Sequence, residues 1–335
     1  MSAPLMRNFQ LSFLACGCNS RCFHCSFANN PEAVEPLPLD DLRRCVAAAE
    51  GMALRVPPLY ERLNVMWGAE PADYPQLAEL VALGVERGWR TVRTLATNAE
   101  RLAREHELLP RLRDAGLETV QLSFYASGHD HDALEGRTGA WDDKLAVGPR
   151  ALDAGLDVVS RLFLRAGHGS ELAPIIQALE EACDGRVRHT VDVWMPAGRG
   201  EHLDRWVPTE EDFEALPASV RGLPRLDEYR SEARWVELAR DGAMAEMLRA
   251  FALDREERGN PDALLNLSRD TVPRAQALLD ELHAEGLASG RVSRAEELGG
   301  APVAAWAELV GRPGSNRMYS VISMRQEWQR RASRA

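Results

Sequence analysis

Lysine is almost absent from this chain of 335 residues. Of the 40 basic residues 39 are arginine, and Lys144 is the only lysine. Lys144 stands in the segment Asp-Asp-Lys-Leu, so no glycine-rich phosphate-binding loop ending in Gly-Lys-Ser/Thr is present. A catalytic Schiff base would have to use this one residue. The scarcity of lysine therefore excludes a common nucleotide site and leaves arginine and histidine to hold anionic groups.

The chain also has no long apolar run and no excess of basic over acidic residues. No stretch approaches the about 18 consecutive apolar residues of a transmembrane helix. The first residues, Met1 to Arg7, lack the apolar segment of a secretory signal. The formal net charge is −11, whereas nucleic-acid binding needs a basic surface. We therefore expect a cytoplasmic protein without a membrane segment, for which nucleic acid is a poor candidate partner.

Cysteine is scarce but concentrated in one place. Four of the six cysteines fall between Cys16 and Cys25. Thiols stay reduced in the cytoplasm, so such a group is more typical of metal ligands than of disulfides. Cys18, Cys22 and Cys25 have the spacing C-x3-C-x2-C, directly after the first expected strand. This spacing lets one loop wrap three thiolates around a small inorganic centre.

Three thiolates from one loop favour a [4Fe–4S] cluster with one iron left without a protein ligand, because soft thiolates suit iron–sulfur centres. Structural zinc with Cys16 as a fourth ligand is the alternative, although zinc sites usually combine ligand pairs from separate segments. Unligated buried cysteines are a third possibility. We expect Cys16 to be a small buried hydrophobic residue. Because no cysteine follows Cys183, we expect no auxiliary cluster.

Strand-like and helix-like segments alternate through the first 208 residues. This alternation predicts an α/β fold of parallel strands joined by right-handed crossovers, either a doubly wound sheet or a barrel. Beyond Pro208 the pattern becomes mainly helix and loop, so we predict a core of residues 1–208 and a helical, substrate-capping region of residues 209–335. The expected strands are 8–15, 63–67, 91–97, 119–125, 157–163 and 189–194, and the expected helices are 39–50, 74–87, 100–115, 141–154 and 172–182.

The segment from Cys18 to Cys25 resembles the cluster motif of the radical S-adenosylmethionine (radical SAM) superfamily. Segments at or after later strands are also similar to that family, namely Gly68-Ala69-Glu70-Pro71, Ala96-Thr97-Asn98-Ala99, Gln121 to Phe124 and Met195 to Arg199. The segments Gly136 to Lys144 and Ala154 to Val158 follow its pattern as well. The resemblance covers about residues 8–205. It implies a partial (β/α)6 TIM-like barrel, a [4Fe–4S] cluster and S-adenosylmethionine (SAM) as cofactors, and an external electron donor of the flavodoxin or ferredoxin type.

The resemblance also implies which residues hold the cofactors. Cys18, Cys22 and Cys25 would each bind one iron. Cleavage of SAM would then give a 5′-deoxyadenosyl radical that takes a hydrogen atom from the substrate. Ala69 departs from the family pattern, because it replaces a glycine. The residues expected to bind SAM are His24, Gly68, Ala69, Glu70, Pro71, Asn98, Ser123 and Arg161.

Polar residues after the fourth, fifth and sixth strands are candidates for substrate contact. Histidine and arginine at one barrel mouth suit a small polar molecule, such as a sugar, a nucleoside or another secondary metabolite. The outcome of the reaction, of oxidoreductase or lyase type, stays open. The candidate residues are Tyr125, His129, His131, Arg137, His168 and Arg199.

Two other functions remain open from the sequence. One is modification of a ribosomally made peptide, which a leader-peptide site near residues 260–290 would favour. That region vaguely resembles a winged helix–turn–helix, although Pro273 would interrupt its second helix. The other is a zinc-stabilised regulatory or nucleic-acid-binding protein.

Overall fold

The computed structural model describes residues 6–13, 16–25, 36, 38–40, 43, 60–67, 70–89, 91–194, 198–200, 202–240, 255–257 and 315–319. Within residues 6–194 the strands are β1 (Met6–Phe13), β2 (Tyr60–Trp67), β3 (Thr94–Thr97), β4 (Thr119–Phe124), β5 (Asp157–Leu164) and β6 (Val187–Val193). The helices there are α2 (Leu77–Glu86), α3 (Glu100–Arg104), α4 (Leu108–Asp114), α5 (Gly128–Glu135), α6 (Ala140–Asp153) and α7 (Leu172–Ala182).

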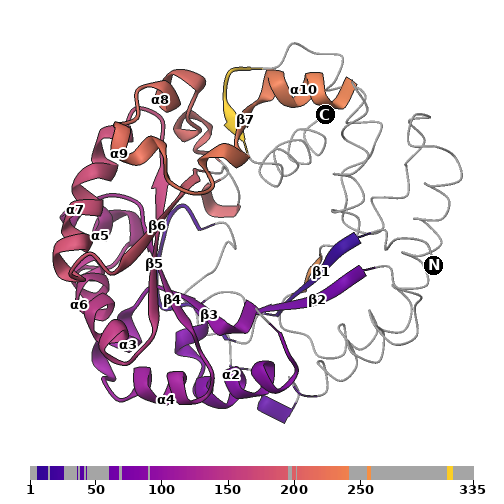
Figure 1. Ribbon diagram of the computed structural model, residues 1–335, viewed down its shortest axis with the longest axis vertical. Helices are drawn as coiled ribbons and strands as arrows, with labels where there is room; N and C mark the ends of the chain where they lie inside the picture. Colours follow the sequence, from indigo (N-terminus) through magenta and orange to yellow (C-terminus); the bar gives the residue numbers. More distant parts are fainter. Residues whose placement is uncertain are drawn as a thin grey trace, which may run out of the picture.

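The strands form an open barrel made of parallel sheets. Strands β3, β4, β5 and β6 pair in that order, and β1 pairs with β2 on one side and with β8 (Arg255–Glu257) on the other. In Figure 1 the strands follow the inside of an arc, and the helices from α2 to α7 lie along its outside. The predicted α/β architecture of a partial barrel is therefore confirmed.

Alternation along the central strands separates a packed face from a cavity face. In β4, Val120, Leu122 and Phe124 are fully buried, whereas Gln121 and Ser123 between them are only half-buried. Because successive side chains of a strand point to opposite faces, the apolar set packs under the helices and the polar set faces the barrel interior. The same alternation continues in β5.

Apolar stripes on the helices complete the core outside the barrel. Leu109 and Leu112 of α4 and Leu179 of α7 belong to one buried cluster with the strand residues. Leu80 of α2 is fully buried as well. Gly116 and Gly155 follow α4 and α6 with φ of +100° and +82°. They end these helices as predicted, since glycine accepts the left-handed conformation.

Two elements differ from the sequence-based expectation. The helix predicted over residues 100–115 is divided into α3 and α4, and Pro110 lies in the first turn of α4, where its missing N–H leaves no helix hydrogen bond unmade. The segment after β4, expected to be a loop, contains α5. That helix has a polar sequence with few buried positions, so its apolar periodicity was too weak to predict it. The expected helix 39–50 lies almost wholly outside the described residues.

The described part of residues 209–335 packs on the same core. It contains α8 (Glu210–Glu214), α9 (Ala218–Arg221), β7 (Arg230–Ser231), α10 (Glu232–Arg240), β8 and β9 (Met318–Tyr319). Leu216, Val220 and Leu226 join the core cluster of the barrel. The mainly helical expectation did not foresee β8 beside β1, nor the antiparallel pair of β7 and β9. Residues 260–290, the winged-helix candidate, lie outside the described residues.

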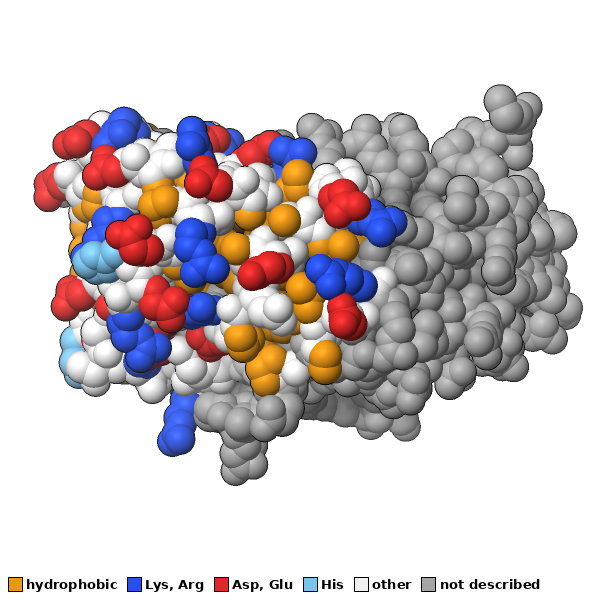
Figure 2. Space-filling model, turned by 90° about the horizontal axis from the view of Figure 1, so that it is seen from below, with side chains coloured by type: hydrophobic (Ala, Val, Ile, Leu, Met, Phe, Trp, Pro, Cys, Tyr) orange, Lys and Arg blue, Asp and Glu red, His pale blue; other side chains and the backbone are white. Residues whose placement is uncertain are grey.

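The surface of the described part mixes charges. Figure 2 shows acidic and basic side chains interspersed with apolar ones over one face. In the described ranges, no helix combines the length and apolar character that crossing a bilayer requires.

Candidate functional site

A cavity of about 250 Å³ opens at the carboxyl ends of the strands. The loop after β1, the ends of β3, β4 and β5, and the residue after β6 all contribute to its wall. Barrel enzymes place their active sites at this end of the strands, because loops from several strands converge there. The lining includes the side chains of Cys18, Cys22, Cys25, Glu70, Asn98, Ser123, Tyr125, Glu135, Arg161 and Trp194.

Main-chain hydrogen bonds fix the cysteine loop of residues 16–25 on the barrel. The N–H of Arg21 donates to the C=O of Glu135 at the end of α5, over 3.2 Å. The N–H of Arg199 donates to the C=O of Cys25 over 2.9 Å. The loop is therefore held both from the segment after β4 and from the segment after β6.

Two glycines allow the cysteine loop to approach the barrel closely. A Cβ on Gly136, whose φ is +63°, would lie 2.9 Å from the carbonyl oxygen of Arg21. A Cβ on Gly200 would lie 3.1 Å from the carbonyl oxygen of His24. Any larger residue at these positions would push the loop outward, so both glycines set its position.

The three motif cysteines are half-buried and line one cavity. Burial raises the pKa of Cys18 to about 12 and that of Cys22 higher still. The Glu135 charge raises the Cys22 pKa further, and the Lys144 charge lowers it. Cys18 and Cys22 therefore keep their protons in the free protein and would lose them on binding metal. Among the described residues, no three ligating side chains converge as closely as a single metal ion would require.

Cys16 is separate from this set. It is 2% exposed, and its thiol donates to the main-chain oxygen of Glu70 over 3.1 Å. Burial raises the pKa of Cys16 to about 12. Cys16 thus stands as the small buried residue that the sequence predicted.

Glu70 joins the ends of β2 and β3. One carboxylate oxygen accepts from the Thr97 hydroxyl over 2.6 Å and from the Ala72 N–H over 3.2 Å, and the other accepts from the Asn98 N–H over 2.6 Å. Burial raises the pKa of Glu70 to about 7, against the lowering effect of the Thr97 and Asn98 hydrogen bonds. Pro71, also buried, begins the single turn Pro71–Asp73. Gly68 and Ala69 lie outside the described residues.

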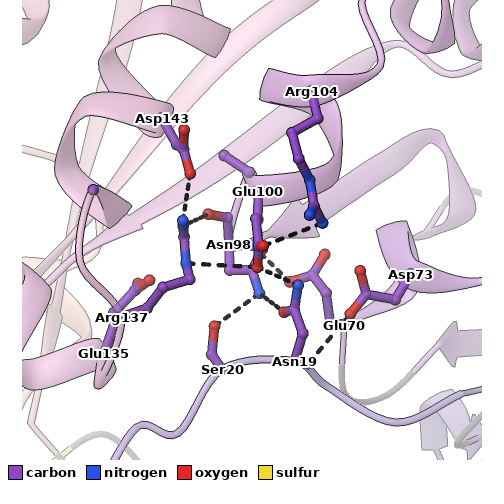
Figure 3. Close-up of polar contacts among 12 residues, drawn as sticks. Asn19, Ser20, Glu70, Asp73, Asn98, Glu100, Arg104, Glu135, Arg137 and Asp143 are labelled. Atoms are coloured by element: carbon purple, nitrogen blue, oxygen red, sulfur yellow. Dashed lines mark hydrogen bonds and ion pairs between the residues drawn. The ribbon is translucent and has the colours of Figure 1, made fainter.

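Asn98 connects this point to the cysteine loop (Figure 3). Its side-chain amide donates to Asn19 Oδ1 over 2.6 Å and to Ser20 Oγ over 2.9 Å. Its own amide oxygen accepts from the N–H of Glu100 over 3.0 Å. The carboxylate of Glu100 in turn accepts from the Asn19 amide. Both ends of the Asn98 side chain are therefore engaged in holding the loop against α3.

Arg137 completes the same network rather than facing the cavity. It pairs with Asp143, donates to the main-chain oxygen of Asn98 over 3.2 Å, and lies 3.7 Å from Glu100 (Figure 3). The guanidinium therefore braces the turn that carries Asn98. This placement differs from the substrate contact expected of Arg137 in a loop, because the helix α5 directs the following residues back toward β3.

Aromatic rings form one wall of the cavity. The His24 ring lies 4.1 Å from that of Tyr125 and 4.8 Å from that of Trp194, centre to centre. Burial lowers the pKa of His24 to about 3, so its imidazole is neutral. Neither ring nitrogen of His24 has a hydrogen-bond partner among the described residues. The wall is thus an apolar surface of mutually tilted rings with two unpartnered ring nitrogens, against which a heteroaromatic ring could pack.

Arg161 reaches the cavity from the middle of β5. Its Nε donates to Asp192 of β6, and Asp192 also accepts from the Tyr229 hydroxyl over 2.9 Å and lies 3.0 Å from Arg225. Asp192 is 2% exposed. Burial alone would lower the pKa of Arg161, but the Asp192 charge raises it. Arg161 is therefore a fixed cation at the cavity wall, with a buried carboxylate behind it.

A second buried ion pair lies on the α5 side of the cavity. Lys144 of α6 is 0% exposed and pairs with Glu135. Its ammonium also lies 2.7 Å from the carbonyl oxygen of Ser123 and 2.8 Å from Nε2 of His131. Burial would raise the pKa of Glu135, but Lys144 and His131 more than offset this and hold it at about 2. Burial and the Lys144 charge lower the pKa of His131.

Of the six residues expected to contact substrate, Tyr125 lines the cavity and the other five lie elsewhere. His131 is 0% exposed beneath Lys144, and His129 is exposed on α5. His168 is 2.7 Å from Glu171. The side chain of Arg199 is exposed, and its main chain holds Cys25. Strand order alone does not predict where these five side chains lie relative to α5 and to the later loops.

Several cavity residues were not identified from the sequence. These are Ser20, Thr97, Gln121, Glu135 and Phe163. Ser20 lies inside the cysteine motif, and Thr97 precedes Asn98, so their neighbours carried a signal that could have found them. Glu135 had no such signal, because it ends a helix that the sequence did not predict.

An open α/β barrel with three thiols and fixed charges at the carboxyl ends of its strands defines a cofactor-dependent barrel enzyme. The family model described as "Radical SAM superfamily" matches residues 13–182. The chain therefore belongs to the radical SAM superfamily and is an enzyme of that family, whose cofactors are a [4Fe–4S] cluster and SAM.

Three solved structures show similarity at low identity. SuiB from Streptococcus suis, bound to S-adenosylmethionine, is 14% identical with a TM-score of 0.45, over 76% of this chain and 51% of that one. Coproporphyrinogen III oxidase (HemN) from Escherichia coli is 14% identical with a TM-score of 0.42, over 71% and 53%. The methyltransferase TsrM from Kitasatospora setae is 11% identical with a TM-score of 0.39, over 58% and 38%.

The chain thus matches only between 38% and 53% of the length of these structures. No curated protein matches the sequence.

The residues present fit the two cofactors. Three thiols, the ligands that iron–sulfur clusters prefer, line one cavity from a single loop. A cluster of four irons takes each thiolate at a different iron, so the thiols need not meet at one point. An aromatic wall with unpartnered nitrogens and a fixed arginine complete a surface for a charged ligand with a heteroaromatic ring.

Proposed function

We propose that this enzyme binds a [4Fe–4S] cluster through Cys18, Cys22 and Cys25 and uses SAM to abstract a hydrogen atom from a small polar substrate. The observation that carries the proposal is that these three thiols line one cavity with Arg161 and Glu135. When bound, the two cofactors supply a 5′-deoxyadenosyl radical by one-electron cleavage of SAM. The chain itself contributes position, charge and exclusion of water.

We assign SAM to the strand ends beside the cysteine loop. Glu70 and Pro71 continue the segment Gly68-Ala69, and together with Asn98 they would hold the amino acid part. Ser123 and Arg161 supply a hydroxyl and a fixed cation for carboxylate or ribose oxygens, and the ring of His24 belongs to the wall where adenine would stack. The support is that His24, Glu70, Asn98, Ser123 and Arg161 all line one cavity.

The substrate would enter beside Tyr125, from the side of the barrel mouth. A small polar molecule is favoured because the lining combines Gln121, Ser123 and Arg161 with aromatic rings. Arginine in such a position suits an anionic or hydroxyl-rich group. We propose that residues 209–335 cap this mouth, since Tyr229 already hydrogen bonds to Asp192 behind Arg161.

The electron would come from outside the chain. The sequence holds only Cys16, Cys45 and Cys183 besides the three motif cysteines, too few for a second cluster with four thiolates. We therefore propose a flavodoxin-type or ferredoxin-type reductant, in the cytoplasm, where thiols stay reduced.

Anaerobic reconstitution tests the proposal. We expect a brown protein with about four irons per chain that forms 5′-deoxyadenosine from SAM when dithionite is added. Cys22→Ala should lose both the iron and 5′-deoxyadenosine formation. Cys16→Ala, which removes a thiol outside the cluster set, is the matched control and should keep both.

A colourless protein that binds a single zinc would contradict the proposal. The substrate class is tested by transfer of deuterium into 5′-deoxyadenosine from labelled sugars, nucleosides or peptides. Transfer from peptides alone would contradict the small-molecule assignment.

A further inference from the structure

Glu135 lines the cavity, but the function proposed so far assigns no role to its ion pair with Lys144. Lys144 is the one lysine of the chain, and it is completely buried at the α5 side of the cavity. Its ammonium has three donors and meets three partners, Glu135, His131 and the carbonyl oxygen of Ser123. An ammonium whose three donors all have partners is fixed in place.

The pair is not explained by stability alone. Burying two charges costs several kcal/mol per ion, and well-packed apolar residues often stabilise a fold as much as a buried ion pair does. In addition, the second carboxylate oxygen of Glu135 is buried and has no hydrogen-bond partner among the described residues. An incompletely satisfied buried carboxylate of this kind indicates that its charge acts on a functional group nearby.

The nearest functional group is the cysteine loop. Glu135 lines the cavity together with Cys18, Cys22 and Cys25, and its carbonyl oxygen holds the N–H of Arg21, next to Cys22. Gly136 brings the two segments still closer, because even a Cβ there would lie 2.9 Å from the oxygen of Arg21. The Glu135 carboxylate is therefore beside the loop, where its charge and that of Lys144 both act on Cys22, and Lys144 pairs with it.

Charges at this position act through a dry interior. Glu135 is 2% exposed and Lys144 is 0% exposed, so solvent screens neither from the cavity. The reduction potential of an iron–sulfur centre depends on net charge, hydrogen bonds and solvent exposure around it. Reduction adds one negative charge to the cluster. A neighbouring carboxylate opposes that step, and a neighbouring ammonium favours it.

We propose that Glu135 and Lys144 are a pair of opposed charges that set the reduction potential of the cluster held by Cys18, Cys22 and Cys25. Glu135 lowers the potential, and Lys144 limits this effect by neutralising most of the carboxylate charge. Both are positioning residues, since neither binds iron. The inference rests on the proposed function, because it requires the cluster.

The test is a midpoint potential, measured by following the spin-resonance signal of the reduced cluster during an anaerobic titration. Glu135→Gln, which keeps the shape of the side chain, should shift the midpoint to a less negative value. Lys144→Met should shift it to a more negative value as the pH is raised, because without the ammonium burial favours the protonated carboxyl and Glu135 ionises only at higher pH. The double variant should fall between the two and close to the wild type.

A purely structural pair would give a different pattern. Both single variants would then lose iron together, or keep a wild-type midpoint, and either result would overturn the inference. If Lys144→Met does not fold, the midpoint potential of Glu135→Gln tests the proposal by itself. Asp130→Asn, which removes an exposed charge from the same helix, is the matched control and should leave the midpoint unchanged. The iron content of the wild type is measured first. If the reconstituted wild type holds no cluster, the proposed function is contradicted rather than this inference.

Discussion

The Thr97 hydroxyl donates to the Glu70 carboxylate over 2.6 Å and so joins the ends of β2 and β3 across 27 positions of the chain. These strands belong to different sheets of the described barrel. No strand-pairing hydrogen bonds link these two sheets among the described residues, so this contact stabilises the barrel at that junction. The junction lies directly beside the cysteine loop.

Thr97→Val should destabilise the protein, because it removes the hydroxyl and leaves the buried Glu70 oxygen with one donor fewer. Leaving a buried polar group with an unmade hydrogen bond costs about 1–3 kcal/mol. The melting temperature should therefore fall by several degrees. Thr94→Val, at an exposed position of the same strand, is the matched control and should melt within about 1 °C of the wild type, since surface changes cost little. Equal melting of the two variants would show that the Glu70 contact contributes nothing.

Gly136→Ala should release the cysteine loop. The positive φ alone costs about 1–2 kcal/mol for alanine. The new Cβ would also meet the Arg21 oxygen, so we expect a lower iron content after reconstitution in addition to a lower melting temperature. Gly139→Ala separates the two effects, because Gly139 has a φ of +80° and nothing within 4 Å of its Cβ position. It should lower the melting temperature but keep the iron. Iron loss in both variants would point to strain rather than to the close approach.

Asp192→Asn should weaken SAM binding by the reconstituted enzyme. Asp192 holds Arg161 in place, and by analogy with the partners that orient metal ligands we expect a loss of about tenfold in affinity. Arg161→Gln should give a similar loss, and the double variant should lose little more, because the two residues act as a unit. Equilibrium binding of radiolabelled SAM provides the measurement.

Asp157→Asn is the control on the same strand. Asp157 pairs with Arg188 over 3.4 Å with both side chains mostly exposed, so its removal should change SAM affinity hardly at all. Additive losses for Arg161 and Asp192 would contradict the idea that they form one unit.

Much of the site was predictable from the sequence, because its key residues are neighbours in the chain or lie at strand ends. The cysteine loop, Glu70 and Asn98 follow β1, β2 and β3 directly, so strand order was enough to bring them together. The pairing of Arg161 with Asp192 was not predictable, because it depends on the register of β5 against β6, where Phe163 stands opposite Asp192. A shift of one residue would turn Asp192 to the other face.

The helix α5 is the clearest case of a missing signal. Without it, His131 and Glu135 looked like loop residues, and nothing related either of them to Lys144. The structure brings the three together through the turn between α5 and α6, which has glycines with positive φ at Gly136 and Gly139. Polar residues inside a short helix give no apolar periodicity, so only the three-dimensional arrangement identifies the ion pair.

Acid should destabilise the protein through Glu135. Its pKa is about 2 in the folded chain, against an ordinary value of 4.5, because Lys144 and His131 outweigh the effect of burial. A lowered carboxyl pKa gives stability that is complete above pH 4.5 and is lost as the pH falls toward 2. The total is on the order of 3 kcal/mol. Urea unfolding between pH 5 and pH 3 should show a steeper loss for the wild type than for Glu135→Gln. Parallel curves would contradict this role of Glu135.

The complete burial of Lys144 has a consequence for the chemistry of the protein surface. Because the chain has no other lysine, the folded protein offers no lysine amine to acylating reagents, to amine cross-linkers or to enzymes that modify lysine side chains. Acylation of Lys144 requires α5 and α6 to separate. The rate of its labelling, read by mass spectrometry of one peptide, therefore reports the opening of this side of the barrel without any engineered probe.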